Sequence, residues 1–137
     1  MKIGFVGLGN VGSKLAGSLL RNGYEVIVRD LNEEFISDFV SRGAVAADSP
    51  MQLAQLSDLI ITCLPSPSAC SVVMEGTDSE AGIIDGLSAG KIWLEMSTTD
   101  ESEMRRLGAL VQAAGADPVD CPVSGGCHRA DTGNISI

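Results

Sequence analysis

The sequence predicts an α/β fold built on a doubly wound, mostly parallel sheet. Short apolar runs alternate with segments of helical period along the whole chain, as a parallel sheet covered by helices requires. The run at 58–63 is apolar without alternation, which is typical of a strand buried on both faces. A glycine-rich turn directly follows the first apolar run. With 137 residues, the chain has the size of one domain.

The first half of the chain follows this alternation closely. Strands are expected at residues 2–6, 25–29 and 44–46. Helices are expected at residues 10–20, 33–41 and 50–56. The first two helices end before Gly23 and Gly43, and glycine suits the left-handed helix end. Ser49 precedes Pro50 at the third helix, the usual pairing of an N-cap with a first-turn proline.

The second half continues the pattern with one interruption. Strands are expected at residues 58–63, 91–95 and 118–120, and residues 135–137 resemble the opening of another strand. Helices are expected at residues 67–74 and 100–114. Between them, residues 75–90 are polar and glycine-rich, with a small apolar turn at Ile83, Ile84 and Leu87.

Charge and composition exclude several classes of partner. The net charge of −9 disfavours nucleic acid and anionic membrane surfaces, both of which require a cationic footprint. No apolar run reaches the roughly 18 residues of a membrane span. The four cysteines and the absence of a leader segment favour a reducing cytoplasm. The spacing of Cys121, Cys127 and His128 matches no common metal motif, so no metal site is expected.

The glycine-rich turn predicts a site for the pyrophosphate of a dinucleotide. It reads Gly7-Leu8-Gly9-Asn10-Val11-Gly12, a G-x-G-x-x-G pattern between a strand and a helix. We expect Gly7 to permit the tight turn, Gly9 to admit the pyrophosphate and Gly12 to let the helix pack on the strand. Unsatisfied N–H groups of the first helical turn would then face the phosphates. The fold is thus expected to be a Rossmann dinucleotide-binding domain.

An acidic residue ends the second strand at the expected distance from this turn. Asp30 would accept hydrogen bonds from the adenosine ribose hydroxyls and repel a 2′-phosphate, which favours NAD over NADP. Arg29 precedes it, and an arginine here can serve NADP. Because side chains alternate along a strand, we expect Arg29 to point to the other face.

Several motifs in one register resemble the β-hydroxyacid dehydrogenase family, which includes 3-hydroxyisobutyrate dehydrogenase and tartronate semialdehyde reductase. The first is the glycine turn within residues 3–32, and the second is the segment 120–126, similar to the family's D-x-P-V-S-G-G substrate motif. Ala130, Gly133 and Asn134 continue that motif. The resemblance covers the whole chain and implies hydride transfer between NAD and a small β-hydroxy acid.

The resemblance also assigns residues to the rest of the site. Leu64 and Pro65 would line the adenosine side of the cofactor, and Thr98 would lie beside the nicotinamide. Ser124, Gly125 and Gly126 would bind the substrate carboxylate. The residues support this last role independently, because two glycine N–H groups and one hydroxyl are three donors in one turn.

One family feature is missing from the chain. The family's catalytic lysine lies on a helix of a second, all-helical domain, and Lys2, Lys14 and Lys91 match no part of that pattern. We therefore expect a dinucleotide-binding domain that is truncated at its C-terminal end, with the lysine beyond residue 137. His128 is expected to be a bystander.

Two other functions stay open. An imine reductase shares this nucleotide domain, although an imine offers no carboxylate for the Ser-Gly-Gly turn. A non-catalytic nucleotide-binding or interaction module would need no lysine. The open edge of the sheet also leaves a homo-oligomer among the alternatives.

Overall fold

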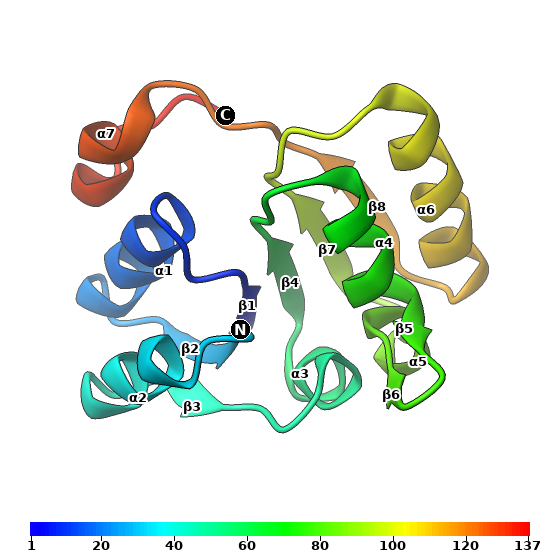
Figure 1. The fold of residues 1–137 in the computed structure, drawn as a ribbon, viewed down its shortest axis with the longest axis horizontal. Coiled ribbons are helices and arrows are strands. Elements are labelled where there is room, and N and C mark those ends of the chain that lie inside the picture. The colour runs from blue at the N-terminus through cyan, green and yellow to red at the C-terminus, as the bar shows by residue number, and fades with distance from the viewer.

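The computed structural model describes residues 1–137 and contains the predicted parallel sheet. Six strands pair in the order β3-β2-β1-β4-β7-β8, and every pair in this sheet is parallel (Figure 1). Taken in chain order this is the 3-2-1-4-5-6 arrangement of the Rossmann fold. The strands are β1 (Lys2–Val6), β2 (Glu25–Arg29), β3 (Val45–Ala46), β4 (Leu59–Thr62), β7 (Ile92–Glu95) and β8 (Asp117–Asp120).

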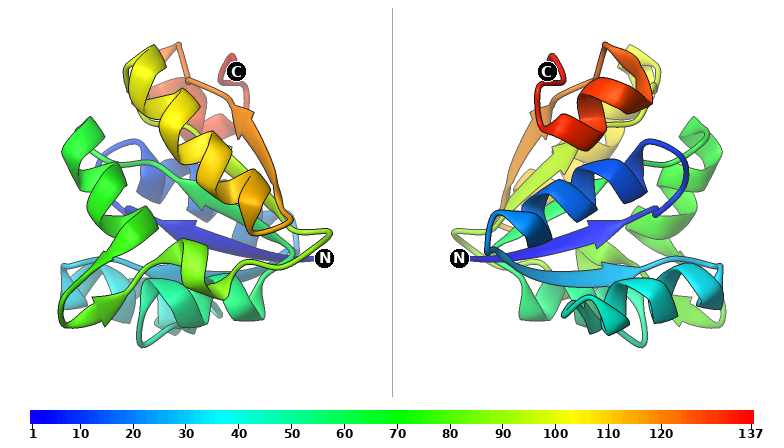
Figure 2. Two further views of the ribbon diagram at one scale, coloured as in Figure 1. Left: turned by 90° about the vertical axis from the view of Figure 1, so that its right-hand side faces the viewer. Right: turned by 90° about the vertical axis from the view of Figure 1, so that its left-hand side faces the viewer.

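Helices cover both faces of the sheet, as the sequence predicts (Figure 2). One face carries α1 (Gly12–Arg21), α2 (Glu33–Ser41) and α7 (Gly126–Thr132). The other carries α3 (Pro50–Leu56), α4 (Pro67–Glu75), α5 (Ile83–Gly86) and α6 (Glu101–Ala113). None of these helices is long and apolar enough to cross a membrane.

Alternation along the strands divides the core into two layers. In β2, Val26 and Val28 belong to the layer under α1 and α2, whereas Ile27 belongs to the layer under α3 to α6. In β4, Ile61 belongs to the layer under α1 and α2, and Ile60 belongs to the layer under α3 to α6. Both layers are built from buried aliphatic side chains together with Trp93, Phe5 and Phe39, so the sheet is a rigid platform for the loops at its carboxyl edge.

Hydrogen-bonding side chains cap the amino ends of α3, α4 and α6. Ser49 caps α3 by accepting the Gln52 N–H at 3.1 Å, with Pro50 in the first turn as predicted. Ser66 caps α4, and Asp100 caps α6. Each cap satisfies an N–H that the helix itself leaves unpaired.

The structure departs from the sequence-based expectation in three places. Residues 135–137 form no strand; only an isolated antiparallel bridge joins Ser124 to Ser136. Helix α7 was not expected, because its sequence lacks an apolar stripe and only Ala130 is buried. Within the polar segment 75–90, a two-stranded hairpin forms from β5 (Gly76–Thr77) and β6 (Glu80–Ala81).

The last strand, β8, forms one edge of the sheet. Asp117 donates its N–H to the carbonyl of Lys91, just before β7, at 3.0 Å, and Cys121 donates to Glu95 of β7 at 2.8 Å. Since alternate residues of a strand point the same way, Pro118 turns its nitrogen away from the sheet. Proline is tolerated there because it breaks no ladder hydrogen bond.

Candidate functional site

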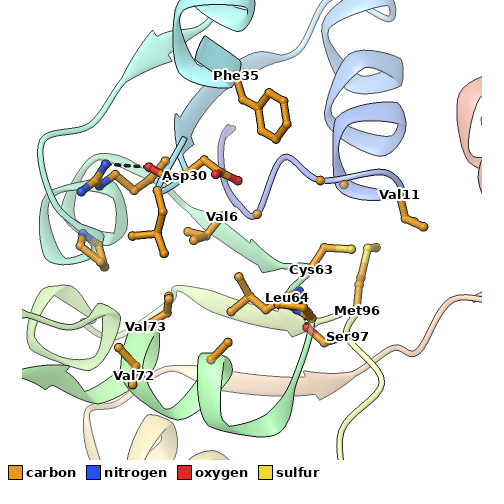
Figure 3. Close-up of a pocket in the computed structure, with 18 of the residues that line it drawn as sticks. Val6, Val11, Asp30, Phe35, Cys63, Leu64, Val72, Val73, Met96 and Ser97 are labelled. Carbon is orange, nitrogen blue, oxygen red and sulfur yellow. Dashed lines mark hydrogen bonds between the residues drawn. The ribbon is translucent and has the colours of Figure 1, made fainter. Parts of the chain in front are cut away.

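A cavity of about 600 Å³ opens at the carboxyl ends of β1, β2, β4 and β7. Chain order reverses between β1 and β4, and such a switch point is where doubly wound sheets bind ligands. Figure 3 shows Asp30 and Phe35 on one wall, with Leu64, Val72 and Val73 facing them on the other. The volume suits a small-molecule or cofactor ligand.

The surroundings of a β-carbon differ at the three glycines of the first turn. Gly7 has a φ of +96°, and a β-carbon there would lie 2.3 Å from the Cys63 carbonyl oxygen. A β-carbon at Gly12 would lie 1.8 Å from the Gly7 carbonyl oxygen. At Gly9, by contrast, a β-carbon would meet no protein atom within 4 Å. The fold thus requires Gly7 and Gly12, whereas the space beside Gly9 is left open to the cavity.

The same turn presents a row of free backbone donors. The N–H groups of Gly9, Asn10, Val11 and Gly12 donate to no protein acceptor. They lie at the amino end of α1, where the helix dipole adds partial positive charge. Such an arrangement can bind phosphate groups without any cationic side chain, which suits a chain of net charge −9.

Asp30 is held at the cavity by the glycine turn itself. Its Oδ2 accepts the Leu8 N–H at 2.6 Å, and its Oδ1 accepts the Asn32 N–H at 2.8 Å. The carboxylate lines the cavity and keeps lone pairs for a further donor. Leu8 does not line the cavity; its side chain is buried in the core, so its contribution is the backbone bond to Asp30.

Arg29 also lines the cavity, which the sequence-based argument did not anticipate. Alternation does place it on the sheet face opposite Asp30, next to the hairpin residue Glu80. However, the cavity spans both faces at the end of β2, so an opposite orientation does not remove Arg29 from it. The geometric reason for excluding Arg29 from the cofactor site is therefore wrong.

The far end of the cavity is formed by the loops after β4 and β7. Leu64 and Pro65 come from the first loop and Thr98 from the second, and all three line the cavity. The Leu64 N–H donates to Ser97 Oγ at 2.7 Å, which ties the two loops together. Sequence reasoning missed this role of Ser97.

A buried carboxyl group anchors these loops from below. Glu95 is fully buried, and its Oε1 accepts the Ser97 N–H at 2.6 Å. Its Oε2 accepts the Thr62 hydroxyl at 3.0 Å and the Cys70 thiol at 2.6 Å. Three donors from separate elements therefore converge on one side chain, as a buried polar group requires.

The cysteine that lines the cavity is not an activated nucleophile. Burial, reinforced by the Glu95 carboxylate, raises the pKa of the Cys63 thiol to about 11. Burial also raises the pKa of the Cys70 thiol, with Glu95 again contributing. Both thiols stay protonated near neutral pH, and the thiolate is the reactive form.

The Ser-Gly-Gly turn lies next to the cavity rather than in its wall. Val123 lines the cavity, whereas Ser124, Gly125 and Gly126 do not. Ser124 pairs with Ser136 through two backbone hydrogen bonds, and the N–H groups of both glycines have no protein acceptor. The donors that were expected to hold a carboxylate are thus available.

Helix α7 fastens this turn to the helix of the glycine turn. Asp131 lies 3.9 Å from Lys14 Nζ and 3.6 Å from Arg21, both on α1. Ala130 is buried in the layer that α1 also covers. The predicted substrate and cofactor segments are therefore packed against each other.

No lysine or histidine reaches the cavity. Lys14 pairs with Asp131, and Lys91 donates to the backbone carbonyls of Gln55 and Ser57. Neither they nor Lys2 and His128 line the cavity.

Most of the remaining lining is apolar and was not predicted. A hydrophobic side chain in a loop or on a half-exposed helix gives no signal by itself, because single exposed apolar residues are common. The missed apolar residues include Val6, Leu31, Phe35, Pro50, Ala69, Val72, Val73 and Met96.

Known proteins match this chain over nearly its full length. 3-Hydroxyisobutyrate dehydrogenase, mitochondrial, of Mus musculus is 36% identical over 98% of this chain and 39% of its own length. 2-(Hydroxymethyl)glutarate dehydrogenase of Eubacterium barkeri is 35% identical over 100% of this chain and 44% of its own length. The chain thus spans about two fifths of the curated relatives it matches.

A solved structure and a family model agree with these matches. The structure of Psf3 in complex with NADP+ and 2-OPP has a TM-score of 0.90 at 29% identity, covering 97% of this chain and 46% of that one. Residues 2–137 match the family model of the NAD binding domain of 6-phosphogluconate dehydrogenase. This chain therefore belongs to the family of NAD-binding domains typified by that of 6-phosphogluconate dehydrogenase.

Proposed function

We propose that residues 1–137 form the cofactor half of an NAD-dependent β-hydroxyacid dehydrogenase. The reaction moves a hydride between the nicotinamide and a small β-hydroxy acid of the 3-hydroxyisobutyrate or tartronate semialdehyde type. The observation that carries the proposal is the row of free N–H groups from Gly9 to Gly12, in the same cavity as the Asp30 carboxylate. The N–H groups bind the pyrophosphate, and the Asp30 carboxylate binds the two hydroxyls of the ribose.

The cavity has a place for each part of NAD. The pyrophosphate lies against the glycine turn, and the adenosine hydroxyls donate to Asp30. The nicotinamide lies at the other end, beside Thr98, with Leu64 and Pro65 along the wall between them. A negative carboxylate at Asp30 disfavours a 2′-phosphate, so NAD is preferred over NADP.

The Ser-Gly-Gly turn supplies the substrate contact in this proposal. Ser124 contributes a hydroxyl, and Gly125 and Gly126 contribute N–H groups that have no protein acceptor. A carboxylate accepts such hydrogen bonds well. The curated relatives support this class of substrate, because their names give 3-hydroxyisobutyrate and 2-(hydroxymethyl)glutarate as substrates.

The general acid/base is expected from a lysine beyond residue 137. This assignment follows the family resemblance, and no lysine or histidine lines the cavity of residues 1–137. A cytoplasmic location remains a prediction, which fractionation would test, and light scattering would test whether the protein forms a homo-oligomer.

Cofactor titration tests the proposal. Calorimetry with NADH and NADPH is expected to show tighter binding of NADH. Asp30→Asn should reduce that preference by about 1–2 kcal/mol, the scale of a hydrogen bond to a charged group. Asparagine is preferable to alanine here because one amide oxygen can still accept the Leu8 N–H. Absence of binding, or tighter NADPH binding by the unmodified protein, would contradict the proposal.

A further inference from the structure

A second carboxylate stands at the adenosine end of the cavity, from a segment far from Asp30 in the sequence. Glu80 lies in the β5–β6 hairpin and lines the cavity. Its Oε1 is 3.4 Å from Nη2 of Arg29. The pair joins the end of β2 to a hairpin that no sequence motif singles out.

The guanidinium of Arg29 is surrounded by acceptors. Its Nη1 donates to the Asp30 carbonyl oxygen at 2.8 Å and lies 3.9 Å from the Glu33 carboxylate. Glu80 holds the other nitrogen. The side chain is only 18% exposed, so these contacts are partly shielded from water. The Arg29 guanidinium therefore lies between two carboxylates and makes two hydrogen bonds within the protein before any ligand enters.

The hairpin holds Glu80 in this place. The Glu80 N–H donates to Thr77 Oγ1 at 3.2 Å, and Thr77 is also its partner across the strands. Gly82 follows in close contact with α4, where a β-carbon would lie 2.4 Å from the Met74 carbonyl oxygen. The carboxylate is thus presented by backbone that is packed against the fold.

We propose that Glu80 is a specificity-determining residue that keeps Arg29 from serving a 2′-phosphate. An arginine at the end of β2 has the fork of donors that binds phosphate well. The Glu80 carboxylate lies against Nη2 of that fork, so the guanidinium is not free to bind a 2′-phosphate. Rejection of NADP then depends on Asp30 and on Glu80 acting through Arg29. This inference rests on the proposed binding of NAD.

The test is the ratio of NADPH to NADH affinity in a small set of variants. Glu80→Gln removes the charge and keeps the size, so the ratio should rise about three- to fivefold, the upper part of the range of one partly exposed ion pair. Glu34→Gln is the matched control, since Glu34 is an exposed carboxylate on α2 without a contact to Arg29. It should leave the ratio within twofold.

A double variant separates a role through Arg29 from a general charge effect. In the Arg29→Gln background, Glu80→Gln should no longer change the ratio. An equal rise in both backgrounds would overturn the role of Arg29, and no rise in the single variant would overturn the role of Glu80. Glu80→Ser is a second variant with the same expected direction, and thermal unfolding checks that each protein is folded. If the unmodified protein binds neither cofactor, the proposed function itself fails.

Discussion

At the scale of single residues, the glycine turn separates what the fold needs from what a ligand needs. Gly7 and Gly12 are fixed by contacts within the protein, whereas the position beside Gly9 is empty of protein atoms. A G-x-G-x-x-G pattern in a sequence does not distinguish these roles. The distances to neighbouring atoms do, and they single out Gly9 as the position to change when binding alone is to be tested.

Gly9→Val is expected to abolish cofactor binding and leave the fold intact. The valine side chain would extend into the space that the pyrophosphate requires, and it would meet no protein atom near its β-carbon. Calorimetry with NADH measures the loss, and circular dichroism with thermal unfolding checks the fold. Gly12→Val is the contrasting control, because its β-carbon collides with the Gly7 carbonyl and should destabilise the protein. Retained NADH binding by Gly9→Val would show that the turn is only structural.

Glu95 stabilises the fold through the three hydrogen bonds that its carboxyl group accepts. Glu95→Leu would leave the Thr62 hydroxyl, the Cys70 thiol and the Ser97 N–H without an acceptor. Each stranded buried donor costs about 1–3 kcal/mol, so the free energy of unfolding should fall by several kcal/mol. Glu95→Gln keeps the size and one acceptor oxygen, and should cost less. Urea unfolding measures both, and equal losses would show that the hydrogen bonds to Glu95 contribute little.

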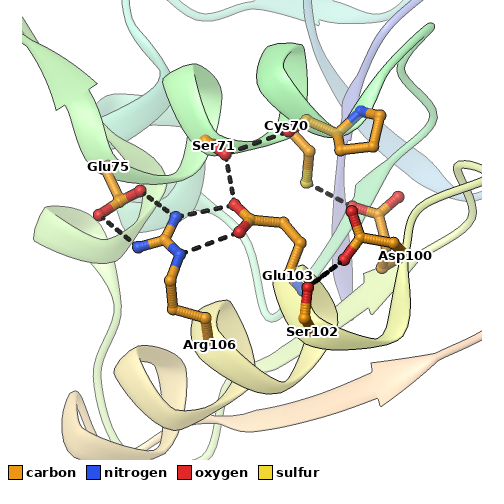
Figure 4. Close-up of polar contacts among 9 residues, drawn as sticks. Cys70, Ser71, Glu75, Asp100, Ser102, Glu103 and Arg106 are labelled. Atoms are coloured by element: carbon orange, nitrogen blue, oxygen red, sulfur yellow. Dashed lines mark hydrogen bonds and ion pairs between the residues drawn. The ribbon is translucent and has the colours of Figure 1, made fainter.

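At the scale of elements, a polar network fastens α4 to α6 (Figure 4). Arg106 of α6 donates to both oxygens of Glu75 on α4, and also to Glu103. Glu103 in turn accepts the hydroxyl of Ser71 on α4. The Arg106 and Ser71 hydrogen bonds lower the pKa of Glu103 from 4.5 to about 2.

This network makes stability depend on pH in the acid range. Because the folded-state pKa of Glu103 is depressed, its contribution is complete above about pH 4.5 and is lost as pH falls toward 2. Glu103→Gln should lower the free energy of unfolding by about 1 kcal/mol at pH 7, since the pair is partly exposed. The two proteins should converge near pH 2. Glu101→Gln, in the exposed pair with Arg105, is the control and should change little. A pH-independent difference for Glu103→Gln would contradict this prediction.

The elements that sequence reasoning identified are those with a strong period. The strand at 58–63 and the helix at 100–114 correspond to β4 and α6 because burial of apolar side chains determines both. Helix α7 was not predicted, because it buries only Ala130 and is held by ion pairs from Asp131 to α1. Such ion pairs leave no periodic pattern of apolar residues in the sequence. The β5–β6 hairpin was not predicted, because each of its strands has only two residues, too few to show an alternating pattern.

At the scale of the whole molecule, the residues alone predicted the candidate site only where geometry demands a residue type, and the family resemblance added Leu64, Pro65 and Thr98. The glycine turn and Asp30 belong to this class. Glu80 does not, because its role depends on where a hairpin lies in space. Arg29 shows the limit of local rules: alternation gave its face correctly, but the cavity extends across both faces.

Residues 1–137 alone are expected to bind cofactor without turning over substrate. Oxidation of the alcohol sends a hydride to the nicotinamide and a proton to a base, and a positioned base contributes about 10²–10⁴-fold. None of Lys2, Lys14, Lys91 and His128 lines the cavity. Following NADH formation with a panel of β-hydroxy acids is the measurement. Turnover that disappears in His128→Ala would show that His128 is the base and that the lysine assignment is wrong.

The two ends of the sheet have a consequence for how the protein behaves at high concentration. A free strand edge is a template on which another chain can add a strand, and such growth leads to fibrils. Here β3 offers only two residues, and β8 turns a proline nitrogen outward between exposed Asp117 and Asp120. An incoming strand would lose a hydrogen bond at Pro118 and meet like charge from an acidic copy of itself. Both edges thus resist templated growth, and any self-association of these residues is left to their helical and loop surfaces.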